Sequence, residues 1–287
     1  MNCTKLFVCC HQNSPVPEHP LLVPIQVGAA LATEKFPGFL YDDDGENISN
    51  KNRSYCELTA QYWAWKNEPA DYYGFFHYRR FLCPEAKAKR PYRIEKAPNE
   101  NTLNKLNFDK MQEIIPQYDL ILPKGENMYV SVREHYATAP FHHKGDMELV
   151  EKIVRGLDPS YADAMEAYFS GTVHYFGNIY IMRRQVFHDY CAWLFPILEE
   201  FDRQADISNY GTQERRVNGY LAERLFGVWL TSQRPYLCVC ELPRVHFVPN
   251  KLERVKKRLI DYMLPPGSKR RAFVKKSARR TGVGNGI

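Results

Sequence analysis

Short apolar runs alternate along this chain with longer stretches in which apolar residues recur every three to four positions. The runs are typical of buried strands, and the periodic stretches are typical of amphipathic helices. Strands are predicted at 5–10, 72–78, 118–124, 179–182 and 237–242, and helices at 54–66, 160–170, 185–200 and 213–230. Strands and helices in alternation predict one α/β domain with a mainly parallel central sheet flanked by helices.

The second predicted strand ends abruptly, because its apolar run turns into His77, Arg79 and Arg80. Unpaired charge is costly to bury, so these side chains must emerge at the strand end or meet an anion. Guanidinium groups suit phosphate and carboxylate, and open α/β sheets bind ligands at the carboxyl ends of their strands. The pattern predicts a diphosphate site. The alternative is that both arginines pair with structural carboxylates such as Asp71 or Glu57.

Two further places offer contacts to an anion. His11 follows the first predicted strand, and the end of that strand usually borders the ligand crevice of an α/β domain. Lys51 lies just before the helix predicted from Ser54, and a helix N-terminus presents free N–H groups to an anion. Ser54 and Glu57 have the spacing of a capping box, which predicts that Glu57 caps this helix.

Candidate acid–base residues occur in two places. His142 and Asp146 are four positions apart, so on a helix they would share one face as a general base and its partner. The alternatives there are a solvated polar helix start and a metal site. On a later helix, Arg216 and Glu223 lie two turns apart and face the same way. That spacing fits either structural ion pairing or a helix that points acid and base into a cleft.

The acidic turn at 42–44 is the most obvious candidate for a metal site. Calcium loops spread their ligands over about twelve residues and end in a bidentate glutamate, a pattern that is absent. We expect a solvated turn, with an Asp-x-Asp metal site as the alternative. The eight cysteines form no C-x-x-C pair and lie mostly in apolar runs, so we expect free thiols in a reducing cytoplasm.

Charge is distributed unevenly along the chain. Residues 251–287 contain twelve basic and two acidic residues, a net charge of +10, so residues 1–250 carry −4 of the total +6. We therefore predict a main domain at 1–250 and a basic tail at 251–287. The acidic body has no nucleic-acid recognition motif, and no apolar run approaches the roughly 20 residues that span a bilayer.

The tail has a helical apolar pattern within its basic sequence. The recurring apolar positions are Leu252, Val255, Leu259 and Tyr262. A basic amphipathic helix followed by a polybasic segment is typical of a protein that lies on an anionic membrane surface. A solvated tail is the alternative.

Several long motifs occur in an order that resembles one bacterial family. They are Asn47-Ile-Ser-x-Lys-Asn52, Glu57-Leu-Thr-Ala-x-Tyr-Trp-Ala-Trp-Lys-Asn67, Tyr73-Gly-x-x-His-Tyr-Arg-Arg-Phe81, Gly177-Asn-x-x-x-Met182, Tyr190-Cys-x-Trp-Leu-Phe195 and Gln213-x-Arg-x-x-x-Gly-x-Leu-Ala-Glu-Arg-Leu225. Over about residues 5–250 the chain resembles bacterial capsular and exopolysaccharide glycosyltransferases, formerly a domain of unknown function (4422). No Gly-rich Rossmann or P-loop motif competes with this resemblance.

The resemblance implies a glycosyltransferase-A type fold and an inverting galactofuranosyltransferase that uses UDP-galactofuranose. The acceptor would be a polysaccharide or lipid-linked oligosaccharide in capsule, exopolysaccharide or O-antigen synthesis, which places the protein in the cytoplasm at the inner face of the cell membrane. Where most enzymes of this fold carry a metal-binding Asp-x-Asp, this chain has His77 to Arg80, so we expect cationic side chains in place of a metal cofactor.

Two alternatives remain: transfer from another UDP-sugar, such as UDP-galactopyranose or UDP-glucose, and a non-catalytic basic protein that binds membrane or nucleic acid. The expected donor-binding residues are His11, Lys51, Asn52, His77, Arg79, Arg80, Asn178 and Arg216, and the expected catalytic residues are Asp146, His142 and Glu223.

Overall fold

The fold is built around one large mixed sheet. The structure is a computed structural model that describes residues 3–84, 90–96 and 106–280. The strands are β1 (Thr4–Cys10), β2 (Leu22–Gln26), β3 (Leu40–Tyr41), β4 (Tyr72–His77), β5 (Arg80–Leu82), β6 (Tyr92–Glu95), β7 (Leu120–Pro123), β8 (Glu126–Asn127), β9 (Val173–His174), β10 (Tyr180–Arg183), β11 (Val239–Leu242) and β12 (Arg244–Phe247). Ten of these described strands form the sheet, and β8 pairs with β9 separately.

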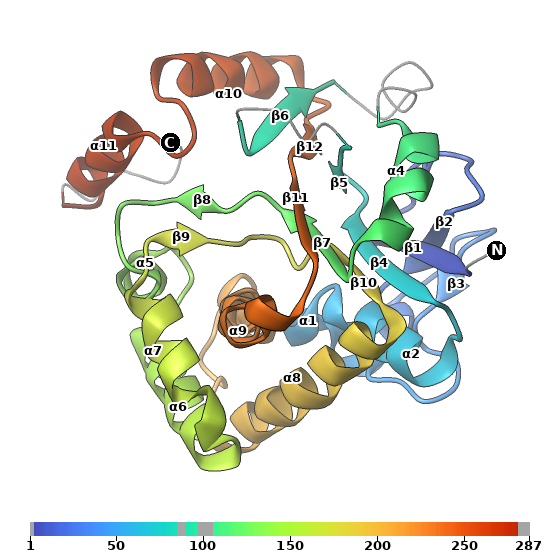
Figure 1. The fold of residues 1–287 in the computed structure, drawn as a ribbon, viewed down its shortest axis with the longest axis horizontal. Coiled ribbons are helices and arrows are strands. Elements are labelled where there is room, and N and C mark those ends of the chain that lie inside the picture. Colours follow the sequence, from blue (N-terminus) through green and yellow to red (C-terminus); the bar gives the residue numbers. More distant parts are fainter. Residues whose placement is uncertain (1–2, 85–89, 97–105, 281–287) are drawn as a thin grey trace.

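Helices cover both faces of this sheet (Figure 1). They are α1 (Asn52–Tyr55), α2 (Leu58–Asn67), α4 (Phe108–Ile114), α5 (Val132–Thr138), α6 (Lys144–Leu157), α7 (Ala162–Ser170), α8 (Arg184–Gln204), α9 (Val217–Gln233), α10 (Lys251–Met263) and α11 (Lys269–Arg280). The predicted α/β class and the helices at 160–170, 185–200 and 213–230 are confirmed to within a few residues.

The prediction of a mainly parallel sheet is confirmed in part, because the sheet is mixed but largely parallel. The strand order is β11-β7-β10-β4-β1-β2-β3, and the parallel pairs β4–β1 and β1–β2 form its centre. However, β10 lies antiparallel between β4 and β7, and β5 runs antiparallel to β4 and β12. Apolar periodicity reports burial and not strand direction, so the sequence pattern does not contain this information.

Strand β1 divides the core into two clusters. Phe7 and Cys9 face the helices α2, α8 and α9, whereas Leu6, Val8 and Cys10 face the side covered by α4. A central strand that is apolar on both faces reads as a continuous hydrophobic run, as the sequence does here. Both faces are therefore closed by helices, and ligand access is left to the ends of the strands.

The helix predicted at 54–66 is broken in two. Cys56 has a positive φ of 52° and separates α1 from α2. The Asn52 side chain donates to the Cys56 carbonyl at 2.7 Å and so stabilises the break. Helix α9 packs closely against it at Gly219, where an added Cβ would lie 3.2 Å from Cys56 Sγ. Glu57 makes no side-chain cap, so the capping-box prediction was wrong.

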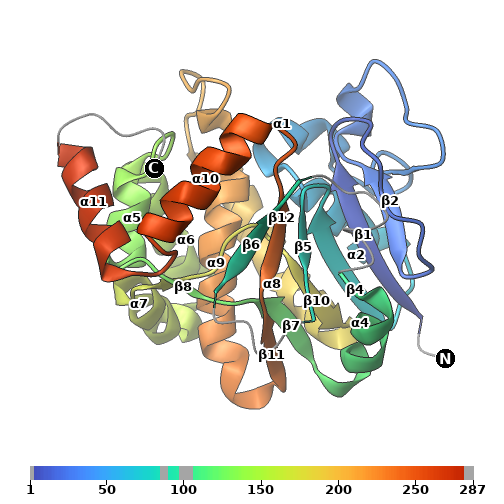
Figure 2. The same cartoon turned by 90° about the horizontal axis from the view of Figure 1, so that it is seen from above.

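Helix α10, the first of the two helices of the tail, packs against β6 (Figures 1 and 2). Its buried side chains are charged: Arg254 donates to the Val248 carbonyl, and Asp261 accepts from the Tyr92 hydroxyl. The predicted helix is confirmed, and its apolar positions Leu252 and Tyr262 are about 80% exposed. Within the described ranges no helix has the length and apolar character of a bilayer-spanning segment.

Candidate functional site

A tight hairpin at the carboxyl end of β4 positions the main basic residues. His77 pairs with Cys9 of the parallel strand β1 and with Arg80 of β5, so only Tyr78 and Arg79 form the turn. The Arg79 N–H donates to His77 Nδ1 at 3.2 Å. A neutral His77 ring therefore carries its proton on Nε2, which is left as a hydrogen-bond donor.

His11 completes this arrangement from the end of β1. Its ring centroid lies 6.2 Å from the His77 ring and 5.1 Å from the Tyr78 ring. The Arg79 guanidinium lies over the ring of Tyr78, 4.9 Å from its centroid. The parallel pairing of β1 and β4 brings these groups together, although they are more than sixty residues apart in sequence.

Arg216 reaches the same place from the N-terminus of α9. Its Nε donates to Cys56 Sγ at 3.3 Å, and its charge is near enough to lower the pKa of both His11 and His77. We call His11, His77, Arg79, Arg80 and Arg216 the basic cluster. It contains five of the eight residues expected to bind a donor.

The electrostatics of the basic cluster favour an anion. Burial, followed by the charges of Arg80 and Arg79, lowers the pKa of His77 to about 2. Arg80 is exposed at the edge of the cluster, yet partial desolvation of its guanidinium and then the charge of the nearby Arg244 lower its pKa. Bringing like charges together is unfavourable unless an opposite charge joins them. The cluster therefore has the character of a site for a multiply charged anion.

The alternative pairing of the arginines with structural carboxylates is only partly realised. Asp71 pairs with Arg184, at 3.1 Å, and not with the arginines of the hairpin. Among the described residues neither Arg79 nor Arg80 forms an ion pair within 4.0 Å. Glu57 does lie near Arg80, because its charge acts on the pKa of that guanidinium.

Two carboxylates border the basic cluster. Glu57 Oε1 accepts from Asn178 Nδ2 at 2.9 Å, and burial raises the Glu57 pKa above its ordinary value. Glu223 is held more firmly: it accepts from the Gly177 N–H at 2.6 Å and from the buried Arg224 at 3.0 Å. The expected donor residue Asn178 is thus a structural link, and its amide also reaches the Gly219 carbonyl.

His142 and Asp146 do not form the pair that their spacing predicts. His142 precedes α6, so the two residues do not share a helical face. Its ring stacks on Tyr220, 4.2 Å between centroids, whereas the buried Asp146 accepts from the Tyr210 hydroxyl at 2.7 Å. His142 is close enough to Glu223 for the carboxylate to act on its pKa, which burial lowers.

The other two expected donor residues lie outside the basic cluster. Lys51 pairs with Asp202 of α8 at 3.1 Å. Asn52 is committed to the α1–α2 break through Cys56 and Thr59. The prediction that Lys51 and Asn52 lie near a helix start is confirmed, but at this start Lys51 contacts α8 and not the basic cluster.

The sequence predicted a solvated acidic turn at 42–44, but one of its carboxylates is buried. Asp42 is fully buried and accepts from the N–H groups of Gly28 and Ala29 and from the Ser49 hydroxyl. Its carboxylate is therefore part of a folded turn. In the described part of the chain no three His, Cys, Asp or Glu side chains are grouped as metal ligands, and the question of a metal stays a prediction.

Sequence reasoning missed two residues at this site. Arg244 on β12 is buried, donates to the Phe176 carbonyl at 3.0 Å and pairs with Glu126. The sequence could have identified Arg244 because, like Arg80, it is an arginine within a strand-like segment. From the sequence, Glu57 was interpreted as a helix cap. It is also the first residue of the family motif at 57–67, and that position was a sign of a role beyond capping.

Comparison with known proteins supports this fold. The chain is similar to the solved apo structure of the WbbM bifunctional glycosyltransferase, with 33% sequence identity and a TM-score of 0.81. The match covers 86% of this chain and 45% of the other, so this chain spans about half the length of WbbM. A model of the family described as "Domain of unknown function (DUF4422)" matches residues 5–234. No match was found among curated proteins.

Proposed function

Because the chain belongs to the DUF4422 family, and because five cationic or imidazole groups converge where β1 and β4 end and α9 begins, we propose that it is a UDP-sugar glycosyltransferase. The observation that carries this proposal is the basic cluster. His77 Nε2 and the guanidinium groups of Arg79, Arg80 and Arg216 would hold the donor diphosphate, with His11 beside it. The similarity to WbbM, itself a glycosyltransferase, supports the same activity.

The chemistry at this site is a substitution at the anomeric carbon of the donor sugar. The acceptor hydroxyl oxygen forms a bond to that carbon while the bond to the diphosphate oxygen breaks, and UDP leaves with the bonding electron pair. Fixed cations stabilise the negative charge that develops on the leaving diphosphate. Inverting transfer also needs a base for the hydroxyl proton.

We assign the role of base to Glu57. It lies next to the basic cluster, and its raised pKa brings it closer to the range in which a carboxylate accepts protons effectively. Glu223 has both oxygens bound by Gly177 and Arg224, so its proposed role is to orient that wall of the site. Asp146 contacts Tyr210 and not the cluster, which makes it the weaker candidate.

The finer proposal is that the donor is UDP-galactofuranose, transferred with inversion to a growing or lipid-linked polysaccharide. It is supported by the family motifs. The test is a panel of UDP-sugars in which hydrolysis of the donor is followed without acceptor. Turnover of UDP-galactofuranose above UDP-galactopyranose and UDP-glucose is expected. No hydrolysis of any donor would favour the non-catalytic alternative.

Activity is expected to persist in EDTA, because arginines at the cluster would neutralise the diphosphate in place of a divalent cation. The measurement is the rate of UDP release with excess EDTA and then with added Mn²⁺ or Mg²⁺. We expect less than a twofold change in either case. Loss of activity in EDTA and its recovery with metal would contradict this prediction.

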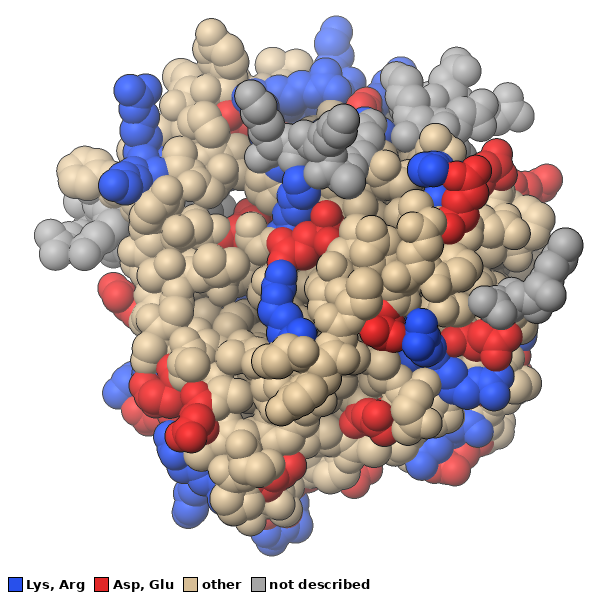
Figure 3. Space-filling view, in the orientation of Figure 1, with Lys and Arg blue, Asp and Glu red and all other residues tan. Residues whose placement is uncertain are grey.

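The tail is proposed to dock on an anionic membrane. Leu252, Val255, Leu259 and Tyr262 are more than half exposed on α10. Lys and Arg side chains gather around α10 and α11 (Figure 3). Charge complementarity and the exposed apolar face support a lipid surface. This placement would bring a lipid-linked acceptor close to the basic cluster, since Arg79 acts on the pKa of Glu253 in α10.

The double variant Leu252→Ser/Tyr262→Ser is expected to reduce pelleting with anionic vesicles by about tenfold, because two apolar side chains are lost from the lipid contact. Co-sedimentation with phosphatidylglycerol and with phosphatidylcholine vesicles measures this. The matched control is Leu157→Ser, which removes an apolar side chain that is 53% exposed on α6. Equal pelleting of the double variant and the wild type would contradict the membrane proposal.

A further inference from the structure

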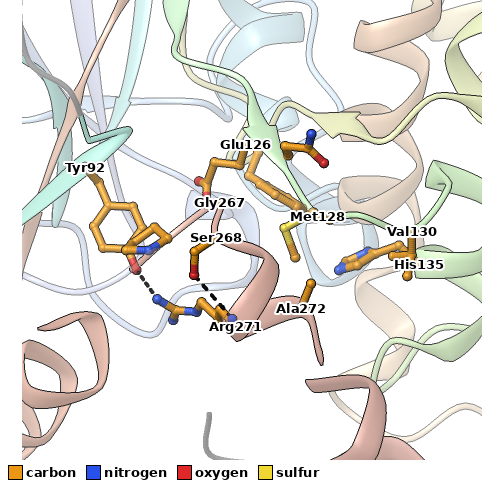
Figure 4. Close-up of a pocket in the computed structure, with 12 residues that line it drawn as sticks. Tyr92, Glu126, Met128, Val130, His135, Gly267, Ser268, Arg271 and Ala272 are labelled. Atoms are coloured by element: carbon orange, nitrogen blue, oxygen red, sulfur yellow. Dashed lines mark hydrogen bonds between the residues drawn. The ribbon is translucent and has the colours of Figure 1, made fainter. Parts of the chain in front are cut away.

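A pocket of about 290 Å³ lies beneath the segment that joins α10 to α11 (Figure 4). One wall comes from the body: Tyr92 of β6, Met128 after β8, and Phe176 after β9. The opposite wall comes from the tail, with Arg271 and Ala272 of α11. Figure 4 shows Met128 and Ala272 approaching the same space from the two sides.

A buried charge pair fixes the tail wall in place. Arg271 Nη1 pairs with Asp261 at 2.5 Å, and both side chains are largely buried. The Tyr92 hydroxyl donates to the same carboxylate at 3.0 Å, which ties β6 to both tail helices. Arg271 also donates to the Leu264 carbonyl at 3.2 Å. Breaking a buried pair of this kind is costly, so the tail segment is a structural wall of the pocket.

The pocket adjoins the basic cluster. Glu126 lines the pocket and pairs with Arg244, and Arg244 is the neighbouring charge that most strongly lowers the pKa of Arg80. Arg244 also donates to the carbonyl of Phe176, whose ring lies in the pocket wall. On β12, Arg244 lies two residues before His246, which pairs with Arg80 of β5, so Arg244 links the pocket residue Glu126 to the strand pair that carries Arg80.

The lining matches the chemistry of a sugar residue. Tyr92 and Phe176 contribute aromatic surface to the lining, and Glu126, Asn127 and Ser268 offer acceptors and donors for hydroxyl groups. Small-molecule pockets are typically about 300–1,000 Å³, so this one suits a single sugar residue better than a long oligosaccharide.

We propose that this pocket binds the terminal sugar of the acceptor, and that the C-terminal tail forms part of the acceptor site. The acceptor role rests on the proposed function, because it needs a donor at the basic cluster. Binding of a sugar in this pocket is independent of the proposed function. The proposal also accounts for why the same tail carries the exposed apolar face of α10: a lipid-linked acceptor has its sugar next to the membrane surface.

The test is ligand-observed saturation-transfer NMR with the full chain and methyl glycosides of glucose, galactose, mannose and N-acetylglucosamine. Ala272→Trp fills the pocket, and Ala272→Leu does so more mildly. Phe273→Trp is the control, because residue 273 is 72% exposed on the same helix and does not line the pocket. UDP is added to each sample as a competitor, and thermal unfolding verifies that each variant is folded.

We expect at least one glycoside to receive saturation from the wild type and from Phe273→Trp, and its signal to fall at least fivefold in Ala272→Trp. The signal should not be displaced by UDP. An unchanged signal in both Ala272 variants, displacement by UDP, or no signal from any glycoside would overturn the inference while UDP binding still held. Absence of UDP binding to the wild type would instead contradict the proposed function, and with it the acceptor role.

Discussion

Replacing Arg80 with alanine is expected to weaken UDP binding by about 30-fold or more. Loss of a charge-assisted contact to a diphosphate typically costs about 2–4 kcal/mol, and each 1.4 kcal/mol is a factor of about ten in affinity. Arg80 pairs with His77 across the hairpin and follows Arg79 directly, and the charge of Arg244 also acts on its pKa. The measurement is titration calorimetry with UDP.

The control for this experiment is Arg155→Ala, which removes an exposed arginine on α6 whose nearest acidic partner is 3.9 Å away. It should leave UDP affinity unchanged. Arg80→Lys should bind with intermediate affinity, since it keeps the charge but loses the planar fork of donors. If Arg80→Ala and Arg79→Ala both bound UDP as tightly as the control, the diphosphate would have to lie elsewhere.

Replacing Glu57 with glutamine is expected to lower turnover by about 10²–10⁴-fold, the range typical of a lost general base, while UDP affinity changes little. The pH profile gives a second readout. A base works when it is deprotonated, and burial raises the pKa of Glu57 above 4.5. The wild-type rate should therefore rise with pH through this raised pKa, and the glutamine variant should lose that limb.

The matched variant is Asp146→Asn, which changes a second buried carboxyl whose pKa is also raised by burial. Asp146 is bound to Tyr210 and lies outside the basic cluster, so we expect turnover within about threefold of the wild type. A large loss in Asp146→Asn with normal turnover in Glu57→Gln would move the base to Asp146. Glu223→Gln should mainly disturb the wall held by Gly177 and Arg224.

Local sequence was sufficient for the elements that depend on near neighbours. The apolar runs of β1 and β4 and the periodic faces of α8 and α9 record burial directly, so these four elements were predicted to within a few residues. The abrupt change at the end of β4 likewise identified His77, Arg79 and Arg80, because charged side chains cannot continue a buried strand.

The tertiary structure decided which distant charges became neighbours. His11 joins His77 because β1 and β4 pair in parallel, and Arg216 joins them from the start of α9. The depression of the His77 pKa comes first from burial, then from the charges of Arg80 and Arg79, and last from His11 and Arg216. The approach of His11 and Arg216 is not encoded in residue spacing, since it depends on strand order and helix packing.

Glu57 and the tail show how packing overrides local patterns. The spacing of Ser54 and Glu57 predicted a cap, but the helix breaks at Cys56, and the Glu57 carboxylate accepts from Asn178 instead. The period of α10 was predicted correctly from sequence, yet which side is buried was decided by β6. On that side, Asp261 accepts a hydrogen bond from Tyr92 and pairs with Arg271, and these partners stabilise its buried carboxylate. The apolar side chains of α10 therefore stay exposed to solvent.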